Sequence, residues 1–246
     1  MFERNKIYNV DSYKAIKEIP DKSIDLIYTD IPYLFESGGS GTSKVAKRIQ
    51  NKKKELQQAD IYNGIDYDLL NEFVRIQPKI YIYIWCSKLQ ILDIMNFFVK
   101  KHNCRFEILT WNKTNPTPQC NGAWLPDIEY CIAFKENGTP KYNDGYENKS
   151  KWYISGINKK DKDLYNHPTI KPLELVERHL KHSCKKGMVV FDPFLGSGTT
   201  AVACKELGID YLGFEINKDY YNIACDRLNG ITQKDKKEME NKITLF

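Results

Sequence analysis

The sequence predicts a single α/β domain built around a mostly parallel, twisted β-sheet. Short apolar runs at residues 24–29, 80–85 and 188–191 have the composition of buried parallel strands. Segments with helical periodicity alternate with these runs, and a glycine-rich turn joins the last of them to a helix. With 246 residues, 41% of them hydrophobic, the chain can bury one substantial core, so we expect one domain over residues 1–246.

The first half of the chain supplies alternating strands and helices, each indicated by its apolar period. Strands and helices are expected in the order strand 7–10, helix 12–18, strand 24–29, helix 68–76, strand 80–85 and helix 89–101. Residues 105–110 and 128–135 also have strand composition. We expect these two segments to pair antiparallel across the proline-rich loop 115–124, which gives the sheet a hairpin at one end.

The C-terminal part has the pattern of a strand, a turn, a helix and a second strand. Pro172 begins a helix that leads into the strand 188–191. Gly196 and Gly198 allow the backbone to approach a ligand closely, and the following helix, 199–207, ends at Gly208. The strand 210–214 then brings Glu215 to a position where an acidic side chain can accept hydrogen bonds from the ribose hydroxyls of a nucleoside cofactor.

Two other nucleotide-binding classes fit this turn poorly. No lysine follows the last glycine, so the turn is not a phosphate-binding P-loop. Only about thirty residues follow Glu215, too few for the remaining strands of a dinucleotide fold, and nicotinamide binding is therefore disfavoured. Taken alone, a strand, a glycine turn and a helix are common to many α/β proteins.

A second motif, Asp30-Ile31-Pro32-Tyr33, ends the apolar run 24–29, where open α/β sheets bind ligands. Together with the segment 191–200, Phe-Asp-Pro-Phe-Leu-Gly-Ser-Gly-Thr-Thr, it resembles the signatures of the amino-methyltransferases of DNA. That family has Asp/Asn/Ser-Pro-Pro-Tyr/Phe for catalysis and Asp-Pro-Phe-x-Gly-Ser-Gly-Thr for S-adenosylmethionine. Residues 8–11, 111–113, 127–130 and 167–172 are similar to further family segments in the same order.

Because the catalytic motif comes first and the cofactor turn last, the chain resembles the β-group of this family. The resemblance implies a Rossmann-like methyltransferase fold that is circularly permuted, with the catalytic half first and the cofactor half last. It also implies that the protein is an S-adenosylmethionine-dependent enzyme that methylates adenine in DNA. Adenine is preferred to cytosine only because family members with Asp in the motif tend to act on adenine.

The resemblance implies a role for each residue of the first motif. The Asp30 carboxylate and the Ile31 carbonyl would accept the two hydrogens of the target amino group, and Tyr33 would stack on a base extruded from the duplex. The family usually has proline at the position of Ile31, but a carbonyl is present in either case. Pro32 restricts the conformation of Ile31 and thereby orients that carbonyl. The alternative is an ordinary Asp-x-Pro turn that ends a strand.

The resemblance also implies a set of cofactor-binding residues. They are Asp11, Thr169, Lys171, Asp192, Phe194, Gly196, Ser197, Gly198, Thr199 and Glu215. Lys171 would neutralise the carboxylate at the methionine end of the cofactor, and Thr169 would donate a hydrogen bond there. The plain alternative is that both residues only begin the following helix. No metal is expected, since a sulfonium is already a good leaving group.

Other functions remain open on the sequence alone. They are a cytosine amino-methyltransferase of DNA, a methyltransferase of RNA or of a protein amide, and a catalytically silent nucleic-acid-binding module. The net charge of +5 suits double-stranded DNA as a partner but also fits many other proteins. A second copy of the chain and a cognate restriction endonuclease are further candidate partners.

Two segments carry candidate roles in DNA binding. Residues 34–66 combine a glycine-rich run with clustered Lys and Arg, and we expect a mobile basic lid over DNA phosphates. Residues 137–166 place aromatic side chains in a polar setting, and we expect a small target-recognition insertion. The alternatives are a solvated charged helix and an irregular loop that covers the edge of the core.

Cysteine, histidine and hydropathy patterns exclude several other classes. The seven cysteines are an odd number without a C-x-x-C pair, so neither a disulfide framework nor a zinc site is indicated, and most are expected in the core. The histidines have no metal-ligand spacing, and His179 and His182 are expected among charged neighbours on a helix. Without a signal pattern or a membrane-length apolar run, the protein is expected in the cytoplasm.

Overall fold

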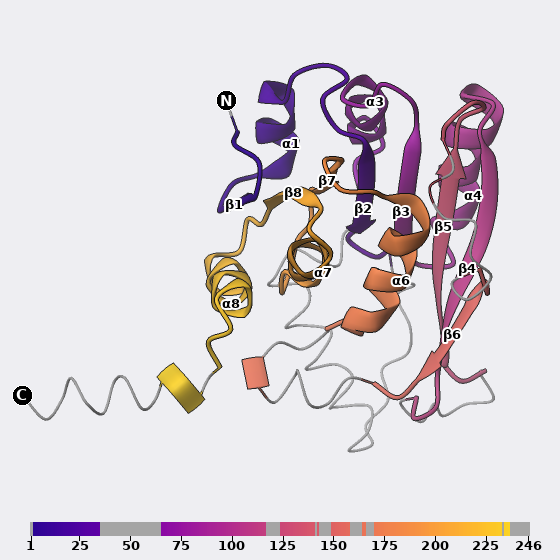
Figure 1. Cartoon of the computed structure of the whole chain (residues 1–246). Coiled ribbons are helices and arrows are strands. Elements are labelled where there is room, and N and C mark those ends of the chain that lie inside the picture. The colour runs from indigo at the N-terminus through magenta and orange to yellow at the C-terminus, as the bar shows by residue number, and fades with distance from the viewer. Residues whose placement is uncertain are drawn as a thin grey trace, which may run out of the picture.

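An eight-stranded sheet runs through the residues that the computed structural model describes, which are 2–34, 65–116, 124–140, 142, 149–157, 164–165, 170–232 and 234–236. The strand order is β1-β8-β7-β2-β3-β5-β4-β6 (Figure 1). The strands are β1 (Lys6–Tyr8), β2 (Leu26–Asp30), β3 (Tyr81–Cys86), β4 (Arg105–Lys113), β5 (Ile128–Lys135), β6 (Trp152–Ser155), β7 (Val189–Asp192) and β8 (Asp210–Phe214).

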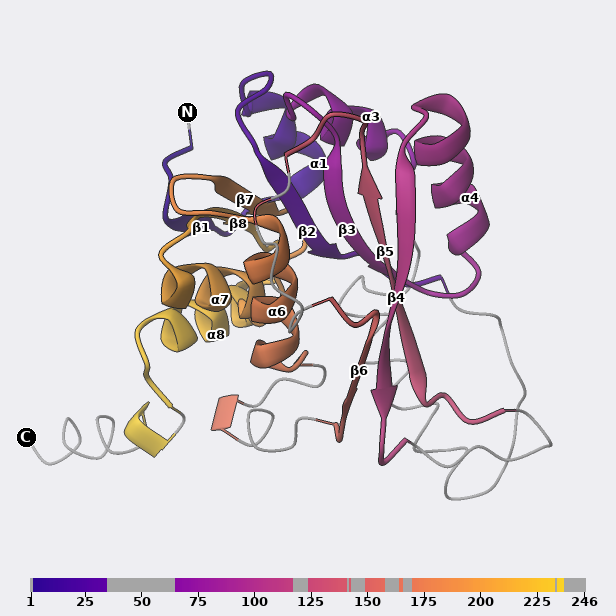
Figure 2. The same ribbon diagram turned by 45° about the vertical axis from the view of Figure 1, so that its right-hand side comes forward.

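Most of this sheet is parallel, as predicted. Strands β1, β8, β7, β2 and β3 pair in parallel with one another, whereas β5 is antiparallel to both β3 and β4. The expected hairpin is therefore confirmed as β4 and β5. Strand β6 adds to the outer edge of β4 in parallel orientation, farthest from β1 (Figure 2).

Helices cover both faces of the sheet, because successive side chains of a buried strand point to opposite sides. Ile27 of β2 packs in the core beneath α1 (Ser12–Ala15), α3 (Leu69–Arg75) and α4 (Ile91–Met95). Its neighbours Leu26 and Tyr28 pack in the opposite core, beneath α6 (Leu173–Ser183), α7 (Thr199–Leu207) and α8 (Lys218–Leu228). The buried cysteines belong to these two cores, as expected: Cys86, Cys104, Cys131, Cys184 and Cys204.

Several elements differ from the predictions. The helix expected over 89–101 is α4 followed by a π-helical segment, Asn96–Lys101, and the first helix ends in a 3-10 turn, Ile16–Glu18. Strand β6 and helix α8 were not predicted. A signal for α8 was available, because the Asn217 side chain caps its start by accepting from the backbone N–H groups of Asp219 and Tyr220. The possible C-terminal edge strand at residues 243–246 lies outside the described residues.

His179, which the sequence placed among charged neighbours on a helix, is a buried residue of α6. The Tyr28 hydroxyl lies 3.0 Å from Nδ1 of His179 and accepts a hydrogen bond of 3.0 Å from Nε1 of Trp85. The apolar side of the helix turns His179 inward, where Tyr83 and Trp85 stack on its ring. The strand that ends at Asp30 is thus tied to α6 by a buried polar group.

This buried histidine predicts an acid-dependent loss of stability. Burial lowers the pKa of His179 to about 3, so between about pH 3 and 6.5 the unfolded chain binds a proton that the folded protein excludes. The free energy of unfolding should therefore fall as the pH drops below about 6.5, by at most about 1.4 kcal/mol per pH unit from this group. Between pH 7.5 and pH 5.5, the free energy of unfolding measured in urea should fall more for the wild type than for His179→Leu. Equal losses in both proteins would contradict the assignment.

Candidate active site

The carboxyl ends of four neighbouring strands collect the predicted site residues. Asp11 follows β1, Glu215 follows β8, the glycine turn follows β7, and Asp30 ends β2. Strands β2 and β7 pair directly, with Leu26 opposite Val190 and Ile27 opposite Phe191. Because parallel strands present their carboxyl ends at one edge, the two motifs lie side by side although about 160 residues separate them in sequence (Figure 1).

The Asp30-Ile31-Pro32-Tyr33 corner is fixed by a residue that the sequence analysis missed, Gln90. Its buried side chain donates from Nε2 to the Pro32 carbonyl at 2.9 Å and accepts at Oε1 from the backbone N–H of Ser87 at 3.1 Å. The backbone N–H of Ile31 donates to the Trp85 carbonyl at 3.2 Å, and the Ile31 side chain is buried. A glutamine between a strand and a helix carries no sequence signal for this role.

A cluster of alternating charges surrounds Asp30. Nζ of Lys171 lies 2.7 Å from Oδ2 of Asp30 and 3.0 Å from Oε2 of Glu129, and Nζ of Lys113 lies 2.6 Å from Oε1 of Glu129. The Lys171 ammonium also lies 4.6 Å from the centre of the Trp85 ring, a cation–π contact. Only 12% of the Lys171 side chain is exposed, whereas 42% of the Asp30 side chain is exposed.

The charges of this cluster shift each other's pKa values. Burial raises the pKa of Asp30, and the Lys171 ammonium opposes part of that rise. Burial alone would also raise the pKa of Glu129, but the ammonium groups of Lys171 and Lys113 lower it to about 2. Although burial opposes the charged form of Lys171, Asp30 and Glu129 raise its pKa. The ammonium groups thus favour the ionised form of Glu129, and the two carboxylates favour the ionised form of Lys171.

The glycine turn after β7 is shaped by hydrogen bonds to two buried carboxylates. Asp192 accepts from the Phe194 backbone N–H at 3.1 Å and from the Thr200 hydroxyl at 2.7 Å, and burial raises its pKa to about 7. Glu215 accepts from the backbone N–H groups of Gly196 at 2.7 Å and Asn217 at 2.8 Å. Asp192 thus supports the turn from within, whereas Glu215 lies at the strand end where a nucleoside would bind.

Arg227 on α8 holds the same turn and was also missed. Its Nη1 donates to the Ser197 carbonyl at 2.8 Å, to the Ser197 hydroxyl at 3.0 Å and to the Thr199 hydroxyl at 2.9 Å. Ser197 and Thr199, both predicted to bind the cofactor, therefore direct their hydroxyls to this buried guanidinium. These hydrogen bonds link the turn to α8.

Replacement of Arg227 should loosen the turn. Arg227→Met removes a charged donor that makes three hydrogen bonds, and we expect a loss of about 2–3 kcal/mol in the free energy of unfolding together with weaker S-adenosylmethionine binding. Arg227→Lys keeps the charge but not the planar guanidinium, so its losses of stability and of cofactor affinity should be smaller than those of Arg227→Met. Urea unfolding and calorimetric titration measure the two effects. Unchanged cofactor affinity in Arg227→Met would contradict the assigned role.

The remaining predicted cofactor residues occupy different positions. Asp11 caps α1 by accepting from the Tyr13 backbone N–H, and the hydroxyl of the next residue, Ser12, donates to the Pro193 carbonyl beside the turn. Phe194 packs edge-on against Tyr13. Nζ of Lys171 donates to Asp30 and Glu129. Thr169 lies outside the described residues.

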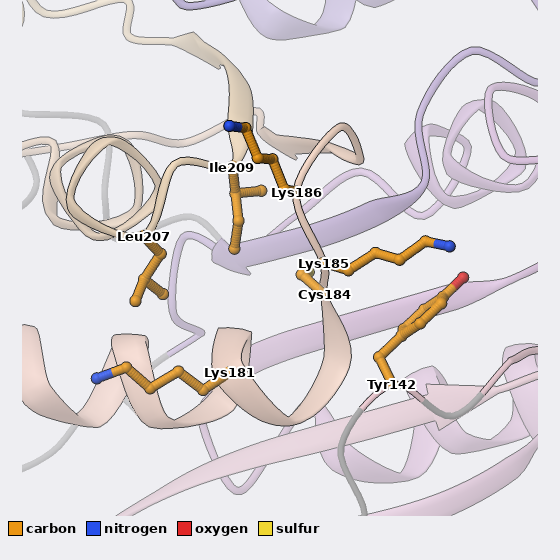
Figure 3. Close-up of a pocket in the computed structure, with 7 residues that line it drawn as sticks. All are labelled: Tyr142, Lys181, Cys184, Lys185, Lys186, Leu207 and Ile209. Atoms are coloured by element: carbon orange, nitrogen blue, oxygen red, sulfur yellow. The ribbon is translucent and has the colours of Figure 1, made fainter.

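A separate cavity of about 330 Å³ lies at the other edge of the sheet, near the amino ends of β7 and β8 (Figure 3). It is lined by Tyr142, Lys181, Cys184, Lys185, Lys186, Leu207 and Ile209. Lys185 lies 5.2 Å from the centre of the Tyr142 ring, and Lys181 pairs with Glu177 on α6. Because the glycine turn and Asp30 follow the opposite ends of the strands, this cavity is not part of the candidate active site.

Neither a metal site nor a membrane-spanning helix is found in the described part of the chain. No group of three or more His, Cys, Asp or Glu side chains there is placed to hold a metal ion. None of the described helices has both the length and the apolar character needed to cross a bilayer.

Comparisons with known proteins agree with this arrangement. A family model described as DNA methylase matches residues 24–226, a range that contains both Asp30 and the glycine turn. The type II methyltransferase M2.LlaDCHI of Lactococcus lactis subsp. cremoris is 30% identical over 243 residues, which cover 91% of this chain and 88% of that protein. The type II methyltransferase M2.DpnII of Streptococcus pneumoniae is 29% identical over 249 residues, covering 92% and 91% of the two chains.

Solved structures show the same fold. The crystal structure of an M1.HpyAVI–SAM complex matches with a TM-score of 0.64 and 25% identity, covering 91% of this chain and 99% of that one. PvuII DNA methyltransferase, described as cytosine-N4-specific, matches with a TM-score of 0.66 at 16% identity, covering 97% and 92%. These matches confirm the predicted methyltransferase fold. Since the family model spans most of the sequence and both motifs meet at one edge of the sheet, the chain belongs to the DNA methylase family.

Proposed function

We propose that this protein transfers a methyl group from S-adenosylmethionine to the exocyclic amino group of adenine in DNA. The observation that carries the proposal is the pairing of β2 with β7, which places Asp30 beside the glycine turn. Membership of the DNA methylase family supports it, as does the likeness to a methyltransferase solved with SAM. Methyl transfer between two bound molecules requires that both be held side by side. Here the carboxylate proposed to orient the nucleophile and the turn proposed to bind the cofactor lie at one edge of the sheet.

The residues at the turn fit a nucleoside cofactor. Gly196 and Gly198 have φ angles of +55° and +82°, which side-chain-bearing residues rarely adopt, so glycine at both positions allows the tight turn. Two backbone N–H groups fix the Glu215 carboxylate, whose remaining lone pairs can accept from ribose hydroxyls. Glu215, Gly196 and Gly198 would hold the cofactor, with Asp11 and Phe194 beside them. S-adenosylmethionine supplies the activated methyl group of a sulfonium.

Asp30 would act on the amino nitrogen of the base. That nitrogen is a poor nucleophile because its lone pair is delocalised into the ring. Hydrogen bonds from its two N–H groups to the Asp30 carboxylate and the Ile31 carbonyl would favour a pyramidal nitrogen and stabilise the positive charge that develops on it. Tyr33 would stack on the extruded base and offset part of the stacking lost from the duplex.

DNA contacts are proposed for two segments. The basic stretch 34–66, of which only residues 34, 65 and 66 are described, is proposed to contact phosphates. Residues 137–166 are proposed to read the target sequence. In support, β6 of this segment exposes Trp152 and Ile154, with 56% and 55% of their surfaces accessible, at the edge of the sheet. Aromatic and apolar groups in such positions can contact bases directly.

Sequencing the DNA of an expressing host with a method that detects modified bases tests the proposal. The expected result is N6-methyladenine at one short sequence motif, absent when Asp30→Ala is expressed. N4-methylcytosine at the motif would favour the cytosine alternative, and transfer of labelled methyl to RNA or protein but not to DNA would favour a methyltransferase of RNA or of a protein amide. Two further partner predictions, a second copy of the chain and a cognate restriction endonuclease, can be tested by light scattering and by co-purification.

A further inference from the structure

We propose that the Lys171 ammonium occupies the place of the target amino group on Asp30 before DNA binds, and that Glu129 receives this ammonium when the base enters. The inference rests on the proposed function and adds two positioning residues to it, Lys171 and Glu129. Its basis is the contact of one buried ammonium with two carboxylates, one at the catalytic corner and one on β5.

The Lys171 ammonium and the target amino group are chemically alike. Both are nitrogen donors of hydrogen bonds, and Nζ of Lys171 lies 2.7 Å from Oδ2 of Asp30, the distance of a full charge-assisted hydrogen bond. The same ammonium lies 5.9 Å from the centre of the Tyr33 ring, the ring proposed to stack on the base. The nitrogen of Lys171 thus marks a position from which an amino group can donate to Asp30.

The Lys171 ammonium disfavours methyl transfer as long as it stays on Asp30. The amino nitrogen of the base gains positive charge as the new bond forms. An ammonium on Asp30 would repel that charge, and it occupies one oxygen of the carboxylate to which the base would donate. Release of Oδ2 by Lys171 would therefore favour methyl transfer.

Glu129 already provides a second partner for the Lys171 ammonium. Only 12% of the Lys171 side chain is exposed, so leaving Asp30 without a new partner would strand a buried charge. Oε2 of Glu129 is 3.0 Å away, and Lys113 holds the other oxygen of Glu129 at 2.6 Å. Because Glu129 is fixed and ionised, Lys171 can give up its salt bridge to Asp30 and still keep the one to Glu129. Glu129 therefore lowers the cost of freeing Asp30.

A double-mutant cycle tests the exchange, with Glu129→Gln, Lys171→Met and the double variant. Glu129→Gln removes the destination and leaves the ammonium on Asp30, so we expect kcat/KM for DNA to fall roughly 10- to 100-fold, the effect of one charge-assisted hydrogen bond. The dissociation constant for S-adenosylmethionine should not change. Adding Lys171→Met removes the competing ammonium and should restore a large part of the lost kcat/KM, so the two losses should not add.

A second measurement reports base entry without chemistry. DNA with 2-aminopurine at the target position becomes more fluorescent when that base leaves the stack, and Glu129→Gln should reduce this increase. Glu129→Asp keeps the charge and should retain more activity than Glu129→Gln, which keeps the test usable if the Gln variant folds poorly. Glu177→Gln, which breaks the Lys181–Glu177 pair on α6, is the matched control and should leave kcat/KM unchanged.

Three outcomes would overturn the inference: losses that add in the double variant, an unchanged kcat/KM in Glu129→Gln, or a loss confined to S-adenosylmethionine binding. The last outcome would instead favour a contact of this cluster with the cofactor. If the wild-type protein methylates no DNA, the proposed function fails, and this result is distinguishable because it is measured before any variant is compared.

Discussion

Asp30→Ala is expected to lower the rate of methyl transfer by at least roughly 10²- to 10³-fold, the usual cost of removing a group that stabilises charge in the transition state. The variant loses the carboxylate that would hold the amino nitrogen, and no other carboxylate ends β2. The fold should persist because Lys171 keeps its salt bridge to Glu129. Cofactor affinity should also persist, since Asp192 and Glu215 shape the turn independently of Asp30.

Single-turnover transfer of labelled methyl to DNA and calorimetric titration with S-adenosylmethionine separate these two effects. Asp30→Asn keeps one carbonyl acceptor without the charge and should lie between the wild type and Asp30→Ala. Glu206→Gln removes an exposed carboxylate from the end of α7, away from the site, and serves as the control for loss of a negative charge. The assignment of Asp30 would be wrong if Asp30→Ala and Glu206→Gln transferred methyl at similar rates.

Gly198→Ala is expected to reduce both stability and cofactor binding, because the position combines two constraints. Its φ of +82° disfavours any side chain, and a Cβ there would lie 2.8 Å from Cβ and 3.1 Å from Cα of Ala224 on α8. Left-handed strain of about 1–2 kcal/mol and overpacking of about 1–3 kcal/mol together predict a loss of roughly 2–5 kcal/mol in the free energy of unfolding. Relief of the clash would push α8 away from the turn.

Gly208 provides a matched control on the same helix. Its φ is +66°, but a Cβ there would meet no heavy atom within 4 Å, so Gly208→Ala should show only the conformational cost of about 1–2 kcal/mol. Urea unfolding of both variants isolates the steric part, and titration with S-adenosylmethionine should show weaker binding for Gly198→Ala alone. Equal destabilisation of the two variants would mean that the contact with α8 does not matter.

Elements with strong local patterns were predictable from the sequence. The helix after the glycine turn has the predicted bounds, Thr199–Leu207, and Gly208 ends it in the left-handed conformation. The apolar run before Asp30 forms a strand buried on both faces, and the antiparallel pairing of β4 with β5 follows from strand composition on both sides of a proline-rich loop. Motif order in the chain was also sufficient to indicate the methyltransferase fold, which the structural matches confirm.

Contacts between distant parts of the chain were decided only by the tertiary structure. Gln90 meets the Pro32 carbonyl across 58 positions, and Arg227 meets Ser197 across 30, and neither residue type carries a local signal for its role. The contacts of Lys171 with Asp30 and Glu129 were not predicted either, because they depend on a strand order that brings β5 and β2 close to each other.

The sequence by itself therefore determined the elements, the two motifs and the chemistry that their residue types allow, because periodicity and turn residues act over a few positions. The tertiary structure decided which buried charge meets which partner, because that choice depends on strand order and on the cost of leaving a charge unpaired away from water.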